Sequence, residues 1–207
     1  MSPRSMSKDE KRAEILDAAI RVFARTGFHA TKIEDVAREA RVAKGTIYLY
    51  FDRREDILDA AFVRFADGVL TQMRAIAKAR EPALSRLRSI VEAMLAGAQS
   101  GPDLARLVFD FWAARRIGGS GERPGTPVDF AGIYVEYRQL IGSLLEQAKD
   151  EGAVRADVPE DTPAVIVGLV EGLLLQCLVD PGALTPSRMA EPALAVILDG
   201  LAPGAPH

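Results

Sequence analysis

The sequence predicts an all-α protein, with a small N-terminal three-helix domain containing a helix-turn-helix and a larger C-terminal helical domain. Two observations support this fold class. Ala, Leu, Arg and Glu dominate the chain, and segments with the period-two alternation of β-strands are hard to find. Helix-start patterns recur within the first 55 residues. The 207 residues, 48% of them hydrophobic, are enough for one large or two small cores.

Three capping patterns predict where the first, second and fourth helices begin. Each pairs a Ser, Thr or Asp with a Glu three residues later, so that side chain and backbone cap each other. The pairs are Ser7 with Glu10, Thr31 with Glu34, and Asp52 with Glu55. Gly27 ends the first helix, and a short turn at 41–43 separates the second helix from the third.

The later helices are predicted from apolar periodicity and from Gly and Pro breaks. A Gly- and Pro-rich loop is expected over 118–127. The expected helices cover residues 8–26, 31–40, 44–51, 53–80, 82–99, 103–117, 128–151, 160–180 and 186–201.

One face of the third helix points away from the core that the helix is expected to pack against. At 100° per residue, Ile47, Tyr50 and Phe51 share one side, while small and polar residues occupy the other. Gly45 falls on the outward side, although glycine within a helix costs about 1 kcal/mol relative to alanine. Close approach of another surface explains this glycine, and loose helix initiation is the alternative reading.

These features predict that the third helix enters the major groove of duplex DNA. Residues 1–54 hold 12 Lys and Arg against 8 Asp and Glu, whereas the rest holds 14 against 21, so the positive charge lies where the helix-turn-helix does. Side chains beside the helix are expected to contact phosphates. The predicted DNA-binding residues are Thr31, Lys32, Lys44, Gly45, Thr46, Tyr48, Leu49 and Arg54.

The segment Lys-Gly-Thr-Ile-Tyr-Leu-Tyr-Phe at 44–51, followed by Arg54-Glu55, resembles the DNA-binding domain of the TetR family of transcriptional regulators. The resemblance covers about residues 8–60. It departs from the family pattern at Arg41, where Gly is common, and at Ala43, where Ser is common. The expected domains are residues 1–54 for DNA binding and 55–207 for effector binding and dimerisation.

The resemblance implies an apolar cavity for a small-molecule effector in the second domain and a homodimer that binds a palindromic operator. The candidate ligand-binding residues are Phe65, Met94, Phe109, Trp112 and Tyr134. The segment 164–179 is apolar on all sides, and the preceding helix has its own apolar stripe. Two such helices from each of two chains would form a four-helix interface; the alternative is that all this surface packs within one chain. The candidate interface residues are Tyr137, Ile141, Leu145, Val165, Gly168, Leu169, Gly172 and Gln176.

The sequence therefore predicts a ligand-responsive repressor, with an activator or a helical adaptor without DNA binding as alternatives. An enzyme is not expected, because the two His residues are His29 and His207 and no metal-ligand spacing or phosphate loop is present. We expect no catalytic site, metal or cofactor. The single Cys177 excludes an internal disulfide, and the N-terminus lacks a signal-type apolar run, so we expect a cytoplasmic protein with no membrane span.

Overall fold

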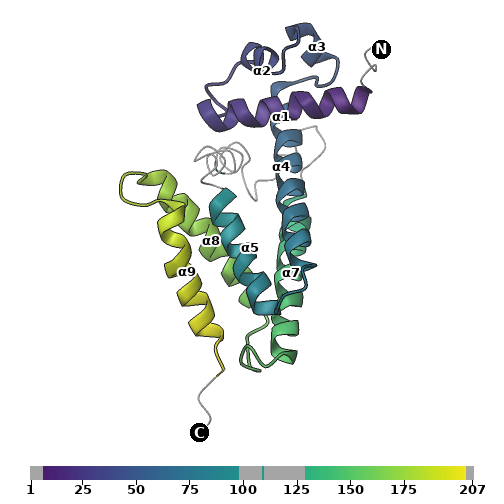
Figure 1. The fold of residues 1–207 in the computed structure, drawn as a ribbon. Helices are drawn as coiled ribbons and strands as arrows, with labels where there is room; N and C mark the ends of the chain where they lie inside the picture. The colour runs from purple at the N-terminus through teal and green to yellow at the C-terminus, as the bar shows by residue number, and fades with distance from the viewer. Residues whose placement is uncertain (1–6, 98–108, 110–128, 204–207) are drawn as a thin grey trace. The chain divides into compact units, whose positions relative to one another are not determined.

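The structure is a computed structural model, and it describes residues 7–97, 109 and 129–203. The described residues confirm the all-α prediction, since their regular elements are helices (Figure 1). The helices are α1 (Lys8–Thr26), α2 (Ile33–Glu39), α3 (Lys44–Tyr48), α4 (Arg54–Ala77), α5 (Ala83–Gly97), α7 (Phe130–Asp150), α8 (Thr162–Val179) and α9 (Pro186–Leu201). Except for Phe109, which is helical, the helix expected over 103–117 and the loop expected over 118–127 lie outside the described residues.

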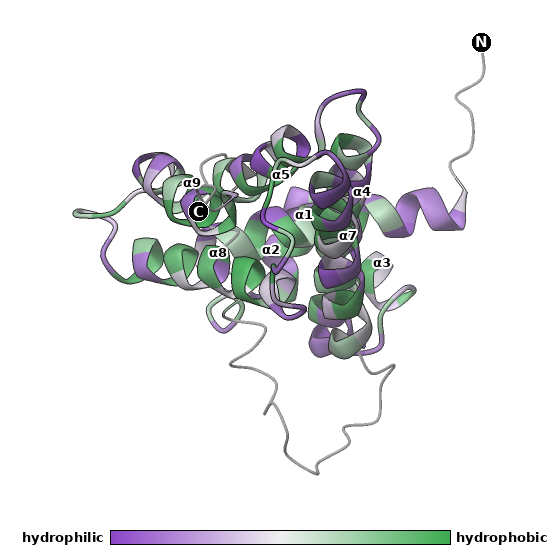
Figure 2. Ribbon diagram, turned by 90° about the horizontal axis from the view of Figure 1, so that it is seen from below, coloured by the Kyte–Doolittle hydropathy of each residue, from purple (hydrophilic) through white to green (hydrophobic). Residues whose placement is uncertain are grey.

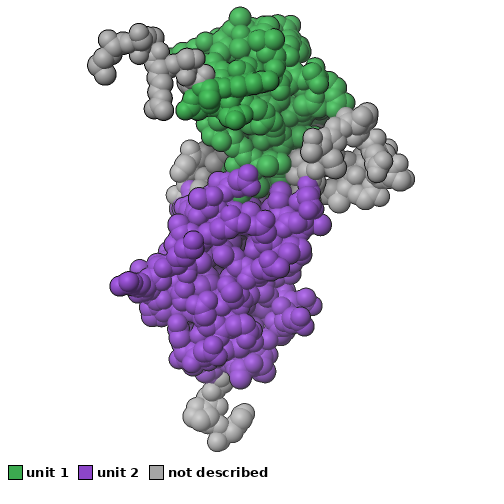
Figure 3. Space-filling model, turned by 90° about the vertical axis from the view of Figure 1, so that its right-hand side faces the viewer, with its two compact units in different colours: residues 1–66, 101–128 green, residues 67–100, 129–207 purple. Residues whose placement is uncertain are grey.

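The chain divides into two compact units (Figure 3). Unit 1 comprises residues 1–66 and 101–128, and unit 2 comprises residues 67–100 and 129–207. The helix α4 begins in the first unit and ends in the second.

The start of α1 confirms the first capping box. The Glu10 N–H donates to the Ser7 hydroxyl at 3.1 Å, and the Ser7 N–H donates to the Glu10 carboxylate at 2.7 Å. Gly27 ends the helix at φ 79°, in the region that favours glycine.

The starts of α2 and α4 lie one residue later than the sequence patterns predict. The Lys32 N–H donates to the Asp35 carboxylate at 3.1 Å, and the Arg53 N–H donates to the Asp56 carboxylate at 3.0 Å. Thr31 is therefore not the N-cap of α2. It is only 3% exposed, and its hydroxyl donates to the Gly27 carbonyl at 2.7 Å, which ties the chain before α2 to the end of α1.

Unit 1 has a core formed by α1, α2, α3 and the first turns of α4. Figure 1 shows α2 and α3 together on one side of α1. Arg64 forms two hydrogen bonds with the Asp17 carboxylate, at 2.5 and 2.8 Å, and so links α4 to α1. The buried side chains of this core include Ile15, Ala19, Val22, Phe23, Val36, Ile47 and Ile57.

Unit 2 is a bundle in which α5 packs against α7, α8 and α9. Buried Arg86 donates to the Ala77 carbonyl and to the Gln147 side chain, at 2.6 and 2.9 Å, and so joins α5 to α7 and to the end of α4. The core residues that contribute most volume are Met73, Leu87, Ile90, Leu95, Ile141 and Leu144.

The helix α8 is apolar along its length (Figure 2). Among the described helices it alone is long and apolar enough to cross a membrane by length and composition, which is weak evidence because core helices pass the same test. Within the chain 28% of its residues are buried, and Val165 and Val179 are largely exposed.

Candidate nucleic-acid interface

The second helix is held firmly against the first. The Glu39 carboxylate near the end of α2 accepts hydrogen bonds from Arg21 and Arg25 of α1, at 2.8 and 3.3 Å. These two contacts lower the pKa of Glu39, with Arg21 contributing most. Ile33, Val36 and Ala37 of α2 are also buried, so side chains of α2 hold the helix in place before the turn that follows.

The turn between α2 and α3 is a Schellman motif centred on Arg41. The Val42 N–H donates to the Ala37 carbonyl at 2.9 Å, and the Arg41 N–H donates to the Arg38 carbonyl at 3.1 Å. Arg41 adopts φ 54°, in the left-handed region. At the end of α7 the same motif has Gly152 at the equivalent position, with φ 68°. Arg41 therefore occupies a site where glycine would be less strained.

The third helix is shorter than predicted and ends at Tyr48 instead of Phe51. Hydrogen bonds from the Tyr50 and Phe51 N–H groups to the Ile47 carbonyl continue the turn and bring the Phe51 ring into the core. Ile47 is fully buried and anchors α3, whereas Tyr50, expected in the core, is only half-buried.

The outward face of α3 is arranged as the helical wheel predicts. Leu49 is 74% exposed and Tyr48 is 47% exposed, although both are large and partly or wholly apolar. Lys44 and Gly45 are exposed, and Thr46 is half-buried. A methyl group added at Gly45 would meet no atom within 4 Å, so packing within this chain does not require the glycine.

Lys44 forms an ion pair with Glu34 of α2, with the Nζ and carboxylate oxygen 2.7 Å apart. The hydrogen bond lowers the pKa of Glu34 and raises the pKa of Lys44. Both side chains are about half exposed, so the pair contributes little to stability and is easily exchanged for another anion.

The flanking positions differ from the expectation in two cases. Thr31 is buried and its hydroxyl is used within unit 1, so it is not placed to bind a phosphate. The Arg54 guanidinium lies over the Phe28 ring, 4.1 Å from its centre, and donates to the Phe28 carbonyl, so it too is used within the unit. Lys32, in contrast, is exposed at the start of α2.

The candidate effector residues fall in different parts of the structure. Met94 and Tyr134 are half-buried against the core of unit 2. Phe65 and Phe109 belong to unit 1, and Trp112 lies outside the described residues. The structure therefore brings Met94 and Tyr134 into one unit, and the Tyr134 hydroxyl donates to the Glu171 carboxylate of α8 at 2.6 Å. The sequence prediction of this site did not include Glu171. A single carboxylate within an otherwise apolar helix is the sequence pattern that could have indicated it.

The α7 residues expected at the dimer interface lie in this chain's own core. Tyr137, Ile141 and Leu145 are buried in the core of unit 2, where they pack within the same chain. Of the residues expected on α8, Leu169 and Gly172 are half-buried, and Val165, Gly168 and Gln176 are exposed.

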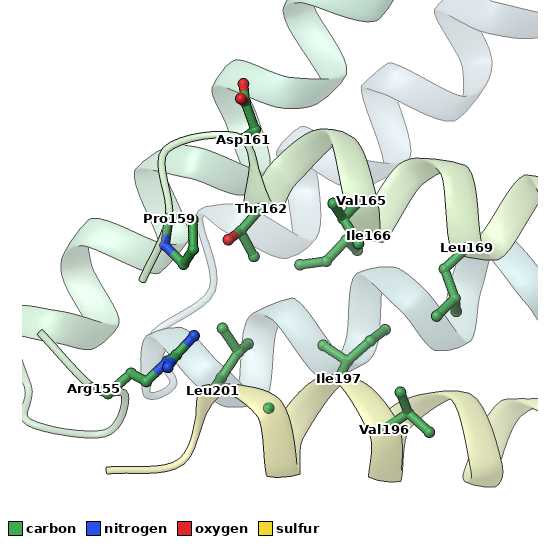
Figure 4. Close-up of a pocket in the computed structure, with 11 residues that line it drawn as sticks. Arg155, Pro159, Asp161, Thr162, Val165, Ile166, Leu169, Val196, Ile197 and Leu201 are labelled. Carbon is green, nitrogen blue, oxygen red and sulfur yellow. The ribbon is translucent and has the colours of Figure 1, made fainter. Parts of the chain in front are cut away.

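The exposed face of α8 continues beyond the predicted residues. Val165 is 65% exposed and Val179 is 76% exposed, with Leu175 between them. On α9, Val196 is 65% exposed. Between the start of α8 and the end of α9 lies a pocket of about 260 Å³, which Val165, Leu169 and Val196 help to line (Figure 4). We call this surface of Val165, Gly168, Gly172, Leu175, Val179 and Val196 the α8–α9 face.

Two family models match the chain. The model of tetR-family bacterial regulatory proteins matches residues 15–61, and the model of the C-terminal domain of BetI-type transcriptional repressors matches residues 83–202. The HTH-type transcriptional repressor KstR2 of Rhodococcus jostii is 24% identical over 204 residues, which cover 97% of this chain and 94% of the relative.

Solved structures share the fold. A putative transcriptional regulator from Saccharomonospora viridis in complex with choline has a TM-score of 0.80 at 23% identity, and the match covers 94% of this chain and 99% of that chain. The regulator FadR from Bacillus subtilis in complex with stearoyl-CoA has a TM-score of 0.71 at 20% identity, covering 91% and 98%. Together with the helix-turn-helix geometry, the two family matches show that this chain belongs to the TetR family of bacterial transcriptional regulators.

Proposed function

We propose that this chain is a cytoplasmic transcriptional repressor that binds a palindromic operator as a homodimer and releases it when a small-molecule effector binds. DNA binding is assigned to residues 1–54, and effector binding and dimerisation are assigned to residues 55–207. The KstR2 relative is a repressor, which favours repression over activation.

The exposed face of α3 carries this proposal. Tyr48 and Leu49 remain largely exposed although burial would stabilise them, and Gly45 is present where the fold has no need of it. A major groove provides a partner for each: a thymine methyl for Leu49, a phosphate for the Tyr48 hydroxyl, and a closely approaching strand at Gly45. Lys44 would exchange its ion pair with Glu34 for a phosphate.

The α8–α9 face supports the homodimer. It combines exposed apolar side chains with Gly168 and Gly172, at neither of which would an added methyl group meet an atom within 4 Å. A second copy of the same face would cover Val165 and Val179 and would allow the two α8 backbones to approach closely. The proposed interface therefore uses α8 with α9, in place of the α7 stripe that the sequence favoured.

An effector acts in this scheme by binding more tightly to a form of the dimer whose two α3 helices do not match the operator. The helix α4 begins six residues after α3 and extends into unit 2, so it is one continuous helical connection between the two units. Related structures hold ligands of opposite charge, stearoyl-CoA and choline. Similarity of fold alone therefore does not select the chemical class of the effector.

Selection of bound duplexes from a random pool tests the proposal. A repressor of this type enriches a palindrome, and recovery without any inverted repeat contradicts the symmetric mode of binding. In the variant Thr46→Ala/Tyr48→Ala the affinity for the enriched duplex should fall at least about tenfold, while circular dichroism and the dimer are unchanged. A variant that binds as tightly as the parent would show that α3 is not the reading helix and would favour the adaptor.

The dimer has its own test. Val165→Arg places a charge on the α8–α9 face without touching the core, so the chain should fold as before and sediment as a monomer. Val135→Arg on α7 is the matched control, since Val135 is also exposed but lies outside the proposed face. A Val165→Arg chain that stays dimeric would remove this face from the interface.

A further inference from the structure

The pocket between the start of α8 and the end of α9, which we call the α8–α9 pocket, has no assigned role in the proposed function. Its volume is about 260 Å³. Its wall is mostly aliphatic and includes Val165, Ile166, Leu169, Val196 and Ile197 (Figure 4). Ile166 and Ile197 are buried, whereas Val165 and Val196 are each 65% exposed. The pocket therefore has a closed aliphatic floor and a rim that solvent reaches.

One end of this pocket is polar. It is lined by Arg155, which precedes α8, and by Thr162, the first residue of α8. Figure 4 shows the Arg155 guanidinium directed toward the space between Pro159 and Leu201. The Asp161 carboxylate points away from that space. The backbone N–H of Arg155 donates to the Leu201 carbonyl at 2.9 Å, so the chain that carries the guanidinium is tied to the end of α9.

The Arg155 guanidinium is incompletely paired. Its Nε is buried and has no hydrogen-bond acceptor within the described part of the chain. The Asp157 carboxylate lies 3.7 Å from this Nε, which is too far for a hydrogen bond, and the Asp157 side chain is 80% exposed. Arg54 and Arg86 also have a buried Nε without an acceptor, but their other nitrogens donate to backbone carbonyls. A buried donor without an acceptor is costly, and an anion that reaches it removes the cost.

A carboxylate with a small aliphatic body fits this arrangement. A guanidinium presents paired N–H donors that match the two oxygens of a carboxylate. The residues that line the pocket include no aromatic side chain, so an organic cation would find no ring to stack on. The volume lies just below the range of about 300–1,000 Å³ that is typical for drug-sized ligands. A long acyl chain or a nucleotide-linked ligand is therefore too large for this pocket.

We propose that the α8–α9 pocket binds a small aliphatic carboxylate. The carboxylate contacts the Arg155 guanidinium and the Thr162 hydroxyl, and the hydrocarbon packs against the side chains of α8 and α9. This site goes beyond the proposed function, because it is a separate binding site whose occupancy is measured without DNA.

A second copy of the chain is the competing occupant, since Val165 and Val196 line the pocket and also belong to the α8–α9 face. The six residues that define that face are apolar or glycine. They would supply aliphatic contact but no acceptor for Arg155, whereas a small carboxylate supplies both.

The test compares two probes that differ in charge but not in chain length, octanoate and octanamide. For a ligand of about ten non-hydrogen atoms we expect a dissociation constant of about 0.01–1 mM. Calorimetric titration of the full-length chain should give at least about tenfold tighter binding of octanoate. In Arg155→Gln this preference should shrink to about threefold or less. Arg188→Gln, which removes an exposed arginine of α9 outside the pocket, should retain it.

A chain-length series tests the aliphatic wall. From butanoate to octanoate the affinity should rise about fourfold for each methylene that the pocket covers. The gain should cease by decanoate, because the pocket is small. Affinity that is independent of chain length, or that still rises from decanoate to dodecanoate, would contradict the site.

The proposal is overturned by equal affinities for octanoate and octanamide, or by an Arg155→Gln chain that retains the preference. Val179→Arg distinguishes the competing occupant, because Val179 lies on the α8–α9 face but does not line the pocket. If only this variant binds octanoate, and does so as a monomer, a second copy fills the pocket in the parent and the proposal fails. Operator binding enters none of these measurements, so their failure leaves the repressor assignment as it stands.

Discussion

Replacing Gly45 by alanine should make the protein more stable and its DNA binding weaker. The added methyl group meets no atom within 4 Å in the free chain, so no clash opposes it. Alanine is favoured over glycine in a helix interior by about 1 kcal/mol. Because α3 has five residues and Gly45 is in its first turn, we expect about half of that gain, or about 0.5 kcal/mol.

On DNA the same methyl group occupies space that the proposed contact gives to the approaching strand. Forcing one extra carbon into a packed contact costs about 1–3 kcal/mol, which corresponds to roughly a 5- to 150-fold loss of affinity. The substitution should raise the stability of the free protein and lower its affinity for DNA. Weaker DNA binding therefore could not be attributed to unfolding.

The assay combines thermal melting with fluorescence anisotropy on the selected operator. Gly68→Ala is the matched control, because Gly68 is an exposed helical glycine on α4 whose added methyl group also meets nothing within 4 Å. The control should melt a few degrees higher, about 2–4 °C per kcal/mol, and bind DNA like the parent. If Gly45→Ala also binds like the parent, the glycine serves helix initiation and the close approach to DNA is refuted.

Three further predictions follow from single contacts. Arg41→Gly removes a non-glycine residue from the left-handed region and should stabilise the chain by about 1 kcal/mol in denaturant melts. If Arg41 contacts a phosphate, the slope of log affinity for the operator against log salt concentration should also decrease by about one. Lys44→Ala should weaken operator binding and lower the same slope, whereas Lys149→Ala, which breaks an equally short 2.7 Å ion pair in unit 2, should change neither. Glu171→Gln should raise the melting temperature at pH 7, and the gain should vanish as the pH falls below about 4, because only the ionised carboxyl with its raised pKa destabilises the folded state; a constant gain would contradict this.

The helix starts show what capping patterns can and cannot predict. Ser7 has both halves of the box, and the prediction there is confirmed. At α2 and α4 only the reciprocal half forms, in which Asp35 and Asp56 accept the backbone N–H three residues earlier. That half uses only the backbone N–H of the N-cap residue, so Lys32 and Arg53 can occupy the N-cap position. A search for Ser, Thr or Asp at the N-cap therefore places the helix start one residue too early.

The faces of α3 and α7 show a second limit. Periodicity predicted correctly that Ile47 is inside and Leu49 outside, because α3 has one apolar side and its partner is adjacent in sequence. The stripe of α7 was also predicted as apolar, but periodicity does not say whether the same chain or another covers it. Ile141 is covered by unit 2 itself. Tyr134 was predicted as a candidate, but its contact with Glu171 was missed because that contact joins positions 37 residues apart.

In the proposed homodimer, twofold symmetry would link the exposed face of α3 to the α8–α9 face. Leu49 and Val165 both leave apolar area in water, which costs about 25 cal/mol per Å² unless a partner covers it. If two α8–α9 faces cover each other, two α3 helices are presented by one assembly. They can occupy successive major grooves only when their separation is close to one turn of DNA, about 34–36 Å. A ligand that changes the separation then lowers affinity for the full operator while leaving each half-site contact intact. Loss of the Val165 contact should therefore weaken binding to a palindrome far more than binding to a single half-site, which distinguishes a defect of assembly from a defect of reading.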